Sequence, residues 1–119
     1  MLSSFYNEKK LFIFNSVLSI TGSIKNQKKL YSSNNQRYKL SYNGEIYNYK
    51  YLQRKYLKGN RTYTNDSDIL INLFENTKNQ INISKRINGM FSYVVFDSFK
   101  NKLIFSSDIQ GEKRLYKYI

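Results

Sequence analysis

Residues 43–48, with the sequence Asn-Gly-Glu-Ile-Tyr-Asn, are the part of the chain best suited to chemistry. Asn43 offers a side-chain amide, Gly44 an unhindered backbone N–H, and Glu45 an acceptor, all within one short segment. Donors held this closely can stabilise a developing oxyanion. The structural alternative is that Asn-Gly is simply a common β-hairpin turn. Either interpretation requires the pair to lie at the end of a strand.

The composition limits which chemistry the chain can perform. Its 119 residues include no Cys and no His, which excludes a thiolate nucleophile, an imidazole base, a disulfide and an ordinary zinc site. We expect neither a metal nor a cofactor. The net charge of +12 comes mainly from Lys. Because Lys, Asn, Ile and Tyr are all abundant, as in an A- and T-rich coding sequence, the charge is weak evidence for a polyanionic partner.

The chain has the size and hydrophobicity of one folded domain. With 40% hydrophobic and 17% aromatic residues it is too apolar for a disordered protein, and 119 residues leave no room for a second domain. Lys9 and Lys10 precede an apolar run, as in a secretory signal. However, Asn15 and Ser16 interrupt that run, and no Ala-containing cleavage pattern follows. We therefore expect a cytoplasmic protein without a membrane partner or a membrane span.

Strands are expected before the motif. Residues 11–14 and 17–20 are short apolar runs typical of strands. Residues 24–36 are polar, lack periodicity and predict a loop. Residues 37–42 alternate polar with apolar side chains, which is the pattern of a half-buried strand. This strand is expected to present Asn43-Gly44 at its end.

Two helices are expected after the motif. Residues 48–57 carry apolar side chains at helical spacing, with Asn48 as the expected N-cap. A second helix is expected to begin with Asp66 or Ser67 as its cap. One further helical turn is expected at 83–87. As a cap, Asp66 would have a structural role worth about 1 kcal/mol.

The rest of the chain is expected to form strands. Residues 90–96 are almost continuously apolar, which predicts a strand covered on both faces. A turn over 97–102 and a strand over 103–105 complete a hairpin, and after a break at 108–111 the residues 115–118 can add a last strand. Strands at both ends with helices between them indicate a layered α+β domain rather than a doubly wound parallel sheet.

Several blocks of the sequence resemble the glutaminase domain of glutamine-hydrolysing asparagine synthetases, a class II, N-terminal-nucleophile amidotransferase domain. Residues 42–49 match the Asn-Gly-Glu-Ile-Tyr-Asn-Tyr block of that family almost word for word. The other similar blocks are 17–20 (His-x-Arg-Leu-Ser-Ile in the family), 64–70 (Thr-x-Ser-Asp-Thr-Glu-Val), 87–97 (Leu-Asn-Gly-Met-Phe-Ala-Phe with a trailing Asp) and 108–116 (Asp-Arg-x-Gly-x-Lys-Pro-Leu-Tyr). Their order and spacing cover nearly the whole chain.

The resemblance implies a fold and a set of residue roles. The fold is a four-layer α-β-β-α arrangement with two antiparallel sheets inside. Residues 1–119 would be a partial domain of this kind, without the first strand and helix and without a synthetase domain. Asn43 and the backbone of Gly44 would form the oxyanion hole for the side-chain carbonyl of glutamine, and Glu45 would line the site. Asp66 would pair with the α-ammonium group of glutamine, a contact of about 1.5–3 kcal/mol.

The sequence departs from the family pattern at catalytic positions. The nucleophile of the family is a Cys at the mature N-terminus whose own α-amino group is the base, and this chain has no Cys. Ser3 and Ser4 are poor replacements, because neither is terminal and neither has a base. Val17 stands where the family has the Arg that binds the α-carboxylate of glutamine, a loss of about 2–5 kcal/mol of binding. The chain alone is expected to be inactive, with glutamine binding weak or lost.

The sequence leaves three functions open. The first is a catalytically incomplete fragment or remnant of a glutaminase domain for asparagine biosynthesis. The second is a non-catalytic module that binds glutamine or another amino acid, or that docks on a separately encoded asparagine synthetase domain. The third is a basic nucleic-acid-binding protein whose Tyr and Phe residues stack on bases. We expect no nucleic-acid partner, because the aromatic residues fall on the core faces of the expected elements.

Overall fold

The computed structural model describes residues 2–8, 11–17 and 31–118, and for 2–8 and 12–17 it describes the backbone alone. These ranges contain six strands and three helices. Their order is β1 (Leu2–Glu8), β2 (Leu11–Val17), β3 (Tyr31–Ser32), β4 (Tyr38–Ile46), α1 (Tyr49–Tyr56), α2 (Asp66–Asn76), α3 (Ile81–Arg86), β5 (Gly89–Asp97) and β6 (Lys102–Ser107).

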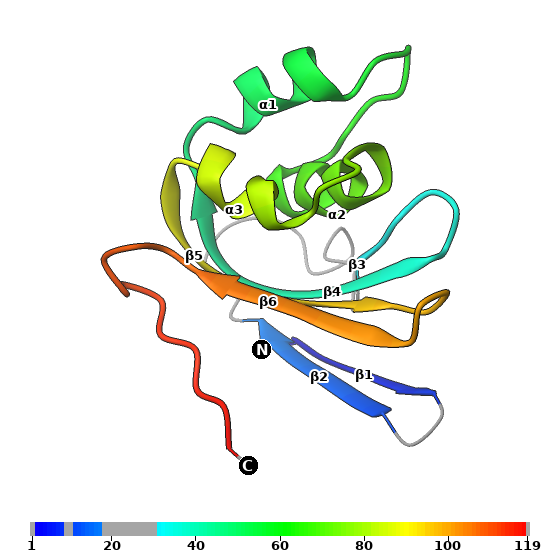
Figure 1. The fold of residues 1–119 in the computed structure, drawn as a ribbon, viewed down its shortest axis with the longest axis vertical. Coiled ribbons are helices and arrows are strands. Elements are labelled where there is room, and N and C mark those ends of the chain that lie inside the picture. Colours follow the sequence, from blue (N-terminus) through cyan, green and yellow to red (C-terminus); the bar gives the residue numbers. More distant parts are fainter. Residues whose placement is uncertain (1, 9–10, 18–30, 119) are drawn as a thin grey trace.

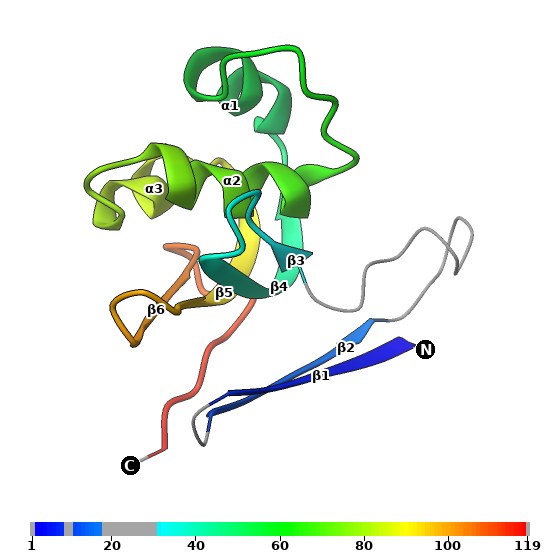
Figure 2. The same ribbon diagram turned by 90° about the vertical axis from the view of Figure 1, so that its right-hand side faces the viewer.

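An antiparallel four-stranded sheet, in the order β3-β4-β5-β6, forms the centre of the molecule (Figure 1). The three described helices lie on one face of this sheet, and the antiparallel hairpin of β1 and β2 lies on the opposite face (Figure 1 and Figure 2). β2 contacts β4 across that second face. The prediction of an α+β domain is therefore confirmed. The four-layer arrangement stays a prediction.

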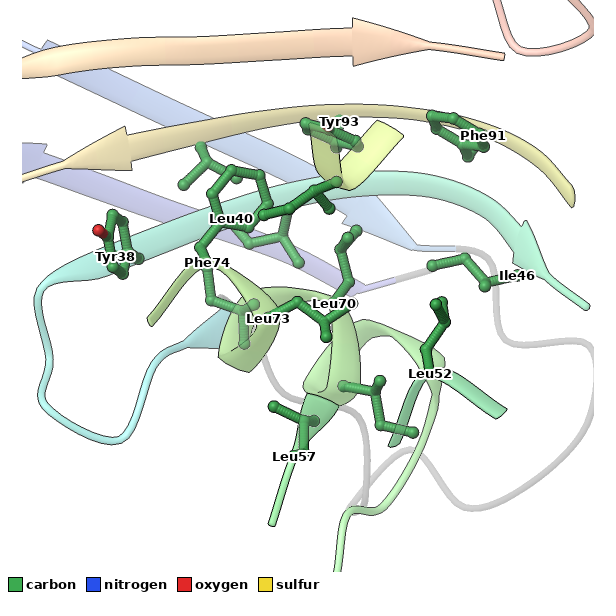
Figure 3. Packing of buried hydrophobic residues seen from close by; sticks show 14 residues of the cluster. Tyr38, Leu40, Ile46, Leu52, Leu57, Leu70, Leu73, Phe74, Phe91 and Tyr93 are labelled. Atoms are coloured by element: carbon green, nitrogen blue, oxygen red, sulfur yellow. The ribbon is translucent and has the colours of Figure 1, made fainter. Parts of the chain in front are cut away.

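The hydrophobic core lies between the helices and the sheet. Because side chains of a strand alternate between its two faces, Leu40 and Val95 point toward α2 and are completely buried. Phe74 of α2 packs on the rings of Tyr38 and Tyr93, with centroids 6.0 and 5.6 Å away (Figure 3). Burying a side chain of this size contributes about 1.5–3 kcal/mol. These ring contacts fix α2 on β4 and β5.

β5 is buried on both of its faces. Phe91, Tyr93 and Val95 face the helices, whereas Phe96 on the other face is also only 3% exposed. The hairpin of β1 and β2 lies on that other side of the sheet (Figure 1). The prediction of a doubly covered strand over 90–96 is therefore confirmed.

The helices lie where the sequence predicts them. α1 and α2 begin within one residue of the predicted starts, and α3 contains the short helical turn expected near 83–87. α2 is buried continuously from Ser67 to Phe74, because it lies against β3 and β4 on one side and α1 on another. No helix in the described part of the chain is long and apolar enough to cross a membrane.

The N-terminal strands differ from the sequence prediction. β2 runs unbroken through Asn15 and Ser16, and both pair with residues of β1. A regular antiparallel ladder overrides the local strand preference of such polar residues. β1 is not among the predicted strands. Of the predicted strand 17–20, Val17 ends β2 and the other positions lie outside the described residues.

The predicted loop over 24–36 contains a short strand. Residues 24–30 lie outside the described residues, and Tyr31–Ser32 forms β3, which pairs with Leu40 and Lys39 of β4. The loop prediction is therefore wrong at these two positions. Two residues are too few to produce a periodic pattern, so the sequence carries no signal for this strand.

The C-terminal segment forms no strand, which corrects the prediction for residues 115–118. Tyr116 and Tyr118 are almost fully exposed, so the segment has no buried face that would hold it in a sheet. The predicted break at Asp108 is present. The backbone N–H groups of Glu112, Lys113 and Phe91 donate to its carboxylate and hold the pKa of Asp108 below its usual value. These bonds tie the loop after β6 to β5.

Candidate functional site

The motif at 43–48 lies mostly within a strand, which corrects the sequence prediction of a turn. The prediction ends the strand at residue 42, but β4 continues through Asn43 and Gly44 to Ile46. The chain turns only at Tyr47 and the residue after it. The hairpin-turn interpretation of Asn-Gly is therefore wrong, and the pair belongs to the β4–β5 ladder.

Gly44 is required in β4 because β5 approaches it closely. A Cβ at Gly44 would lie 2.1 Å from the Met90 carbonyl oxygen and 2.7 Å from the Phe91 Cα. Its φ of +140° is also a conformation that residues other than glycine rarely adopt. Gly89 occupies the reciprocal position on β5, since a Cβ there would lie 2.1 Å from the Glu45 carbonyl oxygen. A glycine inside a strand often marks such a close backbone approach.

The backbone N–H of Gly44 points toward an edge of β4 that is open among the residues the structure describes. In an antiparallel ladder, hydrogen-bonded and non-hydrogen-bonded pairs alternate. The Tyr47 N–H donates to the Asn88 carbonyl oxygen at 2.8 Å, so the odd-numbered residues of β4 are the ones hydrogen-bonded to β5. Gly44 therefore directs its N–H away from β5. On that side, β3 pairs only with Leu40 and Lys39.

Asp66 lies at the same edge of β4, at the start of α2. Its Oδ2 accepts hydrogen bonds from the Tyr42 hydroxyl at 2.8 Å and the Ile46 N–H at 3.1 Å, and its Oδ1 accepts one from the Ser67 N–H at 2.9 Å. Burial and the adjacent Asp66 carboxylate raise the pKa of Tyr42, so the hydroxyl remains a donor. Since positions 44 and 46 of a strand are about 7 Å apart, Asp66 and the Gly44 N–H share one stretch of edge.

Asn65 is the N-cap of α2, which corrects the prediction that Asp66 or Ser67 caps it. The Asn65 side-chain oxygen accepts a hydrogen bond from the Asp68 N–H at 2.9 Å, as an N-cap residue does. Asp66 is the first helical residue, where the helix dipole favours a negative charge. Its carboxylate links α2 to β4 instead of capping the helix.

The side chains of Asn43 and Glu45 lie on the sheet face away from the helices, as strand alternation requires. Both residues are exposed. Asn43 lines a hollow of about 80 Å³ together with residues of β5 and Leu115 of the C-terminal segment. The structure thus brings Gly44 and Asp66 together along the edge, and places Asn43 and Glu45 on the adjoining face.

Asn48 joins the end of β4 to the link between α3 and β5. Its Nδ2 donates to the Arg86 carbonyl oxygen at 2.9 Å, and its Oδ1 accepts from the Asn88 N–H at 2.9 Å. Asn48 immediately precedes α1, as predicted for an N-cap, but its side chain makes no capping hydrogen bond. The last residue of the motif therefore connects two segments that are far apart in the sequence.

Sequence reasoning missed the two groups of β4 that hold Asp66. One is the Tyr42 hydroxyl, which the start of the matched block at 42–49 could have indicated. The other is the Ile46 N–H, a backbone group that leaves no mark on a side-chain pattern. The Ile46 N–H reaches Asp66 because β4 extends past residue 42.

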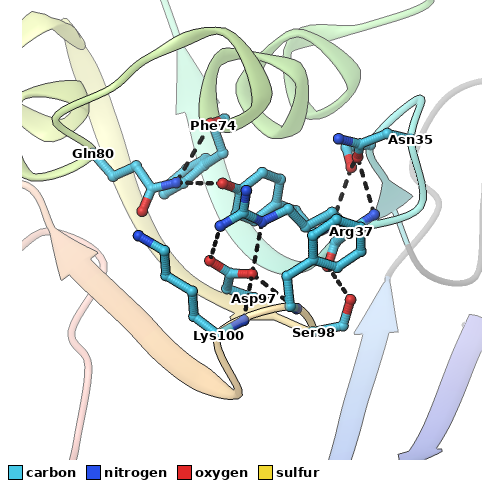
Figure 4. A network of polar contacts seen from close by, with 10 residues as sticks. Asn35, Arg37, Phe74, Gln80, Asp97, Ser98 and Lys100 are labelled. Atoms are coloured by element: carbon cyan, nitrogen blue, oxygen red, sulfur yellow. Dashed lines mark hydrogen bonds and ion pairs between the residues drawn. The ribbon is translucent and has the colours of Figure 1, made fainter.

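A second polar cluster lies at the opposite end of β4 (Figure 4). The Arg37 guanidinium donates one 2.8 Å hydrogen bond to each oxygen of Asp97, which is completely buried. The Arg37 carbon Cζ lies 4.9 and 5.1 Å from the ring centroids of Tyr38 and Phe99. The bond from Arg37 holds the pKa of Asp97 below its usual value. This ion pair ties the start of β4 to the β5–β6 turn.

The larger hollows lie away from the predicted site residues. One of about 630 Å³ lies beside Arg37, between the α2–α3 link and β6. Another of about 330 Å³ lies between α3 and the loop after β6. Asn43, Gly44, Glu45 and Asp66 line neither of them. The described residues contain no group of three or more Asp, Glu, His or Cys that could hold a metal ion.

The fold and the site together define a class: an α+β domain with backbone donors and a carboxylate along one open strand edge. Residues 15–119 match the family described as a glutamine amidotransferase domain. The chain belongs to this family. The resemblance to the glutaminase domain of asparagine synthetases, predicted from the sequence, is confirmed by this match and by the curated relatives.

Three relatives illustrate that similarity. Putative asparagine synthetase [glutamine-hydrolyzing] 2 of Methanocaldococcus jannaschii is 36% identical over 77 residues, which is 65% of this chain and 14% of the relative. Probable asparagine synthetase [glutamine-hydrolyzing] of Schizosaccharomyces pombe is 36% identical over 78 residues, 66% of this chain and 14% of the relative. Asparagine synthetase [glutamine-hydrolyzing] 2 of Bacillus subtilis is 36% identical over 74 residues, which is 62% of this chain and 10% of the relative. The chain thus spans only 10–14% of the length of these relatives.

Proposed function

We propose that residues 1–119 are the glutamine-holding part of a class II glutaminase domain and do not hydrolyse glutamine on their own. Membership of the glutamine amidotransferase family and the similarity to glutamine-hydrolysing relatives support glutamine as the ligand. The observation that carries the proposal is the alignment of the Gly44 N–H and the Asp66 carboxylate along the open edge of β4. The proposed fold is an incomplete four-layer α-β-β-α domain, without a synthetase domain in these residues.

Asn43 and Gly44 form the oxyanion hole in this proposal. The outward direction of the Gly44 N–H supports the role, and the exposed Asn43 amide is the donor next to it. Two such donors stabilise the negative charge that grows on the amide oxygen of glutamine as its carbon becomes tetrahedral. Removal of one donor of this kind from an enzyme raises the barrier by about 2.7–4 kcal/mol.

Asp66 binds the α-ammonium group of glutamine, and Glu45 lines the same site. Each carboxylate oxygen has two lone-pair positions. On Oδ2 of Asp66 both are used by Tyr42 and Ile46, whereas on Oδ1 one is used by Ser67. The second position on Oδ1 is therefore the one that accepts a hydrogen bond from the ammonium group.

Hydrolysis is excluded from the proposal because the bond-making group is missing. Acyl transfer from glutamine needs a nucleophile and a base that removes its proton, and these residues include neither Cys nor His. Val17 also cannot form the ion pair with the α-carboxylate that an Arg forms. We therefore expect weak binding, with a Kd in the millimolar range, and no release of ammonia.

Hydrolysis is tested by incubating the purified 119-residue protein with glutamine and measuring ammonia and glutamate. We expect no release above a buffer blank. The variant Asn43→Ala removes a proposed oxyanion donor, and Asn60→Ala, in an exposed loop, is its matched control. Release that persists in Asn60→Ala and disappears in Asn43→Ala would overturn the proposed inactivity.

Binding is tested separately, by titrating glutamine into the protein and following the backbone amide signals by NMR. We expect the signals of Gly44 and Ile46 to move, because their N–H groups lie along the proposed site. The amide of Lys117, in the exposed C-terminal segment, serves as an internal control. If neither Gly44 nor Ile46 responds to glutamine, the proposal of a glutamine-holding module is wrong.

A second candidate function is docking on a separately encoded asparagine synthetase domain. Exposed apolar side chains after β6 favour it, since Ile109 of the loop and Tyr116 and Tyr118 of the C-terminal segment are each more than 80% exposed. Size-exclusion chromatography with a synthetase domain from the same genome tests it. Loss of co-elution in Tyr116→Ser would support docking, and the absence of any complex would exclude it. For either function, the cytoplasmic location stays a prediction.

A further inference from the structure

We infer that Tyr42 is a positioning residue for substrate recognition: its hydroxyl, together with the Ile46 N–H, orients the Asp66 carboxylate and so creates the preference for ligands that carry an α-amino group. This inference rests on the proposed function of the same site. It assigns a role to a residue that touches no ligand atom itself.

The two donors converge on one oxygen of Asp66. The Tyr42 hydroxyl lies 2.8 Å and the Ile46 N–H 3.1 Å from Oδ2. Both groups belong to β4, whereas Asp66 belongs to α2. The orientation of the carboxylate therefore follows the strand whose Gly44 N–H is the proposed oxyanion donor. In this way β4 sets the positions of both the Gly44 N–H and the Asp66 carboxylate.

The Tyr42 side chain is anchored along its length by the strand and by the core. Its ring packs against the hydrophobic core and lies opposite Tyr93 in the β4–β5 ladder. Since the ring is fixed at its base by the strand and along its length by packing, the hydroxyl has little freedom to move. The carboxylate of Asp66 is also held by the Ile46 and Ser67 N–H groups, and the Tyr42 hydroxyl is the side-chain donor that completes this set.

The hydrogen bonds also decide which oxygen meets the ligand. Among the described donors, two bond to Oδ2 and one to Oδ1, so this part of the chain leaves a position for a further donor on Oδ1. Without the Tyr42 hydroxyl, Oδ2 would keep one donor and the carboxylate could turn. The two oxygens would then compete for the same backbone groups, and the ammonium group would lose its fixed acceptor.

The test compares two ligands on the full 119-residue chain. Glutamine and 4-carbamoylbutanoate have the same amide and carboxylate, but only glutamine has the α-amino group. We expect the parent protein to bind glutamine more tightly. In Tyr42→Phe, which keeps the ring, this preference should fall roughly three- to tenfold, the worth of one hydrogen bond, while the Kd for 4-carbamoylbutanoate stays unchanged.

Tyr93→Phe is the matched control, because it removes the hydroxyl of the buried Tyr that lies opposite Tyr42 on the same face of the ladder. We expect it to keep the preference of the parent. Hydrogen exchange of the Ile46 amide gives a readout that needs no ligand. Exchange should accelerate in Tyr42→Phe, as the acceptor becomes mobile, and should not change in Tyr93→Phe.

The outcomes separate this inference from the proposed function. A parent that prefers glutamine, with the same preference in Tyr42→Phe, overturns the inference and leaves the function intact. An equal loss of affinity for both ligands also overturns it, because that is the result of a purely structural role. A parent that binds both ligands equally, or neither, overturns the assignment of Asp66 and the inference together.

Discussion

Gly44 contributes to the fold and to the proposed site through the same property, the absence of a Cβ. The missing side chain allows the Met90 carbonyl group of β5 to approach. The resulting ladder leaves the Gly44 N–H directed at the edge of β4. A residue with a side chain at this position would separate the strands and move the N–H that the proposed oxyanion hole depends on.

Gly44→Ala is expected to lower the free energy of unfolding by about 2–4 kcal/mol. The added methyl carbon would lie 2.1 Å from the Met90 carbonyl oxygen, at a φ of +140°. Urea denaturation followed by circular dichroism measures the loss. Gly111→Ala is the control, because Gly111 also has a positive φ, +68°, but no atom lies within 4 Å of its Cβ position. Gly111→Ala should lower the free energy of unfolding by about 1 kcal/mol. If both variants lose the same amount, the close approach of β5 is not the reason that position 44 requires glycine.

The sequence was sufficient to single out residues with useful chemical groups, but not to predict which residues they contact. Asn43, Gly44, Glu45 and Asp66 stand out because of their types and spacing, and their roles toward glutamine stay predictions. An Asn-Gly pair has the same local signature in a turn and in a close strand approach, so only the partner strand distinguishes the two. The bond from Tyr42 to Asp66 spans 24 positions, which no local pattern encodes.

At the scale of elements, α2 connects the candidate site to the core. Its buried residues from Ser67 to Phe74 pack on the sheet and on α1, while its first residue, Asp66, reaches the edge of β4. The start of this helix therefore determines where the carboxylate lies. If the first turn of α2 unfolds locally, the Asp66 carboxylate is displaced while the buried residues further along the helix stay packed.

Asn65→Ala is expected to reduce the free energy of unfolding by about 1 kcal/mol, because it removes the side-chain acceptor for the Asp68 N–H. The thermal midpoint should fall accordingly. Asn60→Ala, in the exposed loop before α2, should change the stability by less than about 0.5 kcal/mol. A stable Asn65→Ala variant would show that the bonds of Asp66 are sufficient to hold the helix start.

The elements that the sequence predicted are those with a strong periodic pattern. α1, α2 and β5 each bury an apolar stripe or run that can be recognised locally. β3 is too short for a pattern, and the end of β4 is polar and glycine-containing. These strands exist because a neighbouring strand supplies hydrogen bonds, which is a tertiary effect.

At the scale of the whole molecule, two buried carboxylates connect loops to the central sheet. Asp97 joins the start of β4 to the β5–β6 turn through Arg37, and Asp108 joins the loop after β6 to β5. Their hydrogen bonds lower both pKa values. With a net charge of +12, the chain has few other carboxylates to offset the repulsion among its Lys and Arg side chains.

The protein is expected to lose stability in acid. A carboxyl group whose folded pKa lies below its unfolded value, about 3.9 for Asp, contributes fully above that value and loses the contribution as the pH falls through the folded pKa. Asp97 and Asp108 both have this sign. Urea midpoints measured between pH 7 and pH 2.5 should therefore be flat down to about pH 5 and then fall steadily. Protonation of the other carboxylates increases the positive charge and acts in the same direction.

Asp97→Asn separates the contribution of the ion pair from that of the net charge. At pH 7 the free energy of unfolding of the variant should be about 3 kcal/mol lower than that of the parent. This value is at the lower end of the usual cost of breaking a buried ion pair, because the Arg37 side chain is 22% exposed. Below pH 4 the gap between parent and variant should narrow, since the parent then loses the same ion pair by protonation. A gap that stays constant to pH 2.5 would mean that Asp97 contributes through packing alone, and the acid sensitivity would then belong to Asp108 and the net charge.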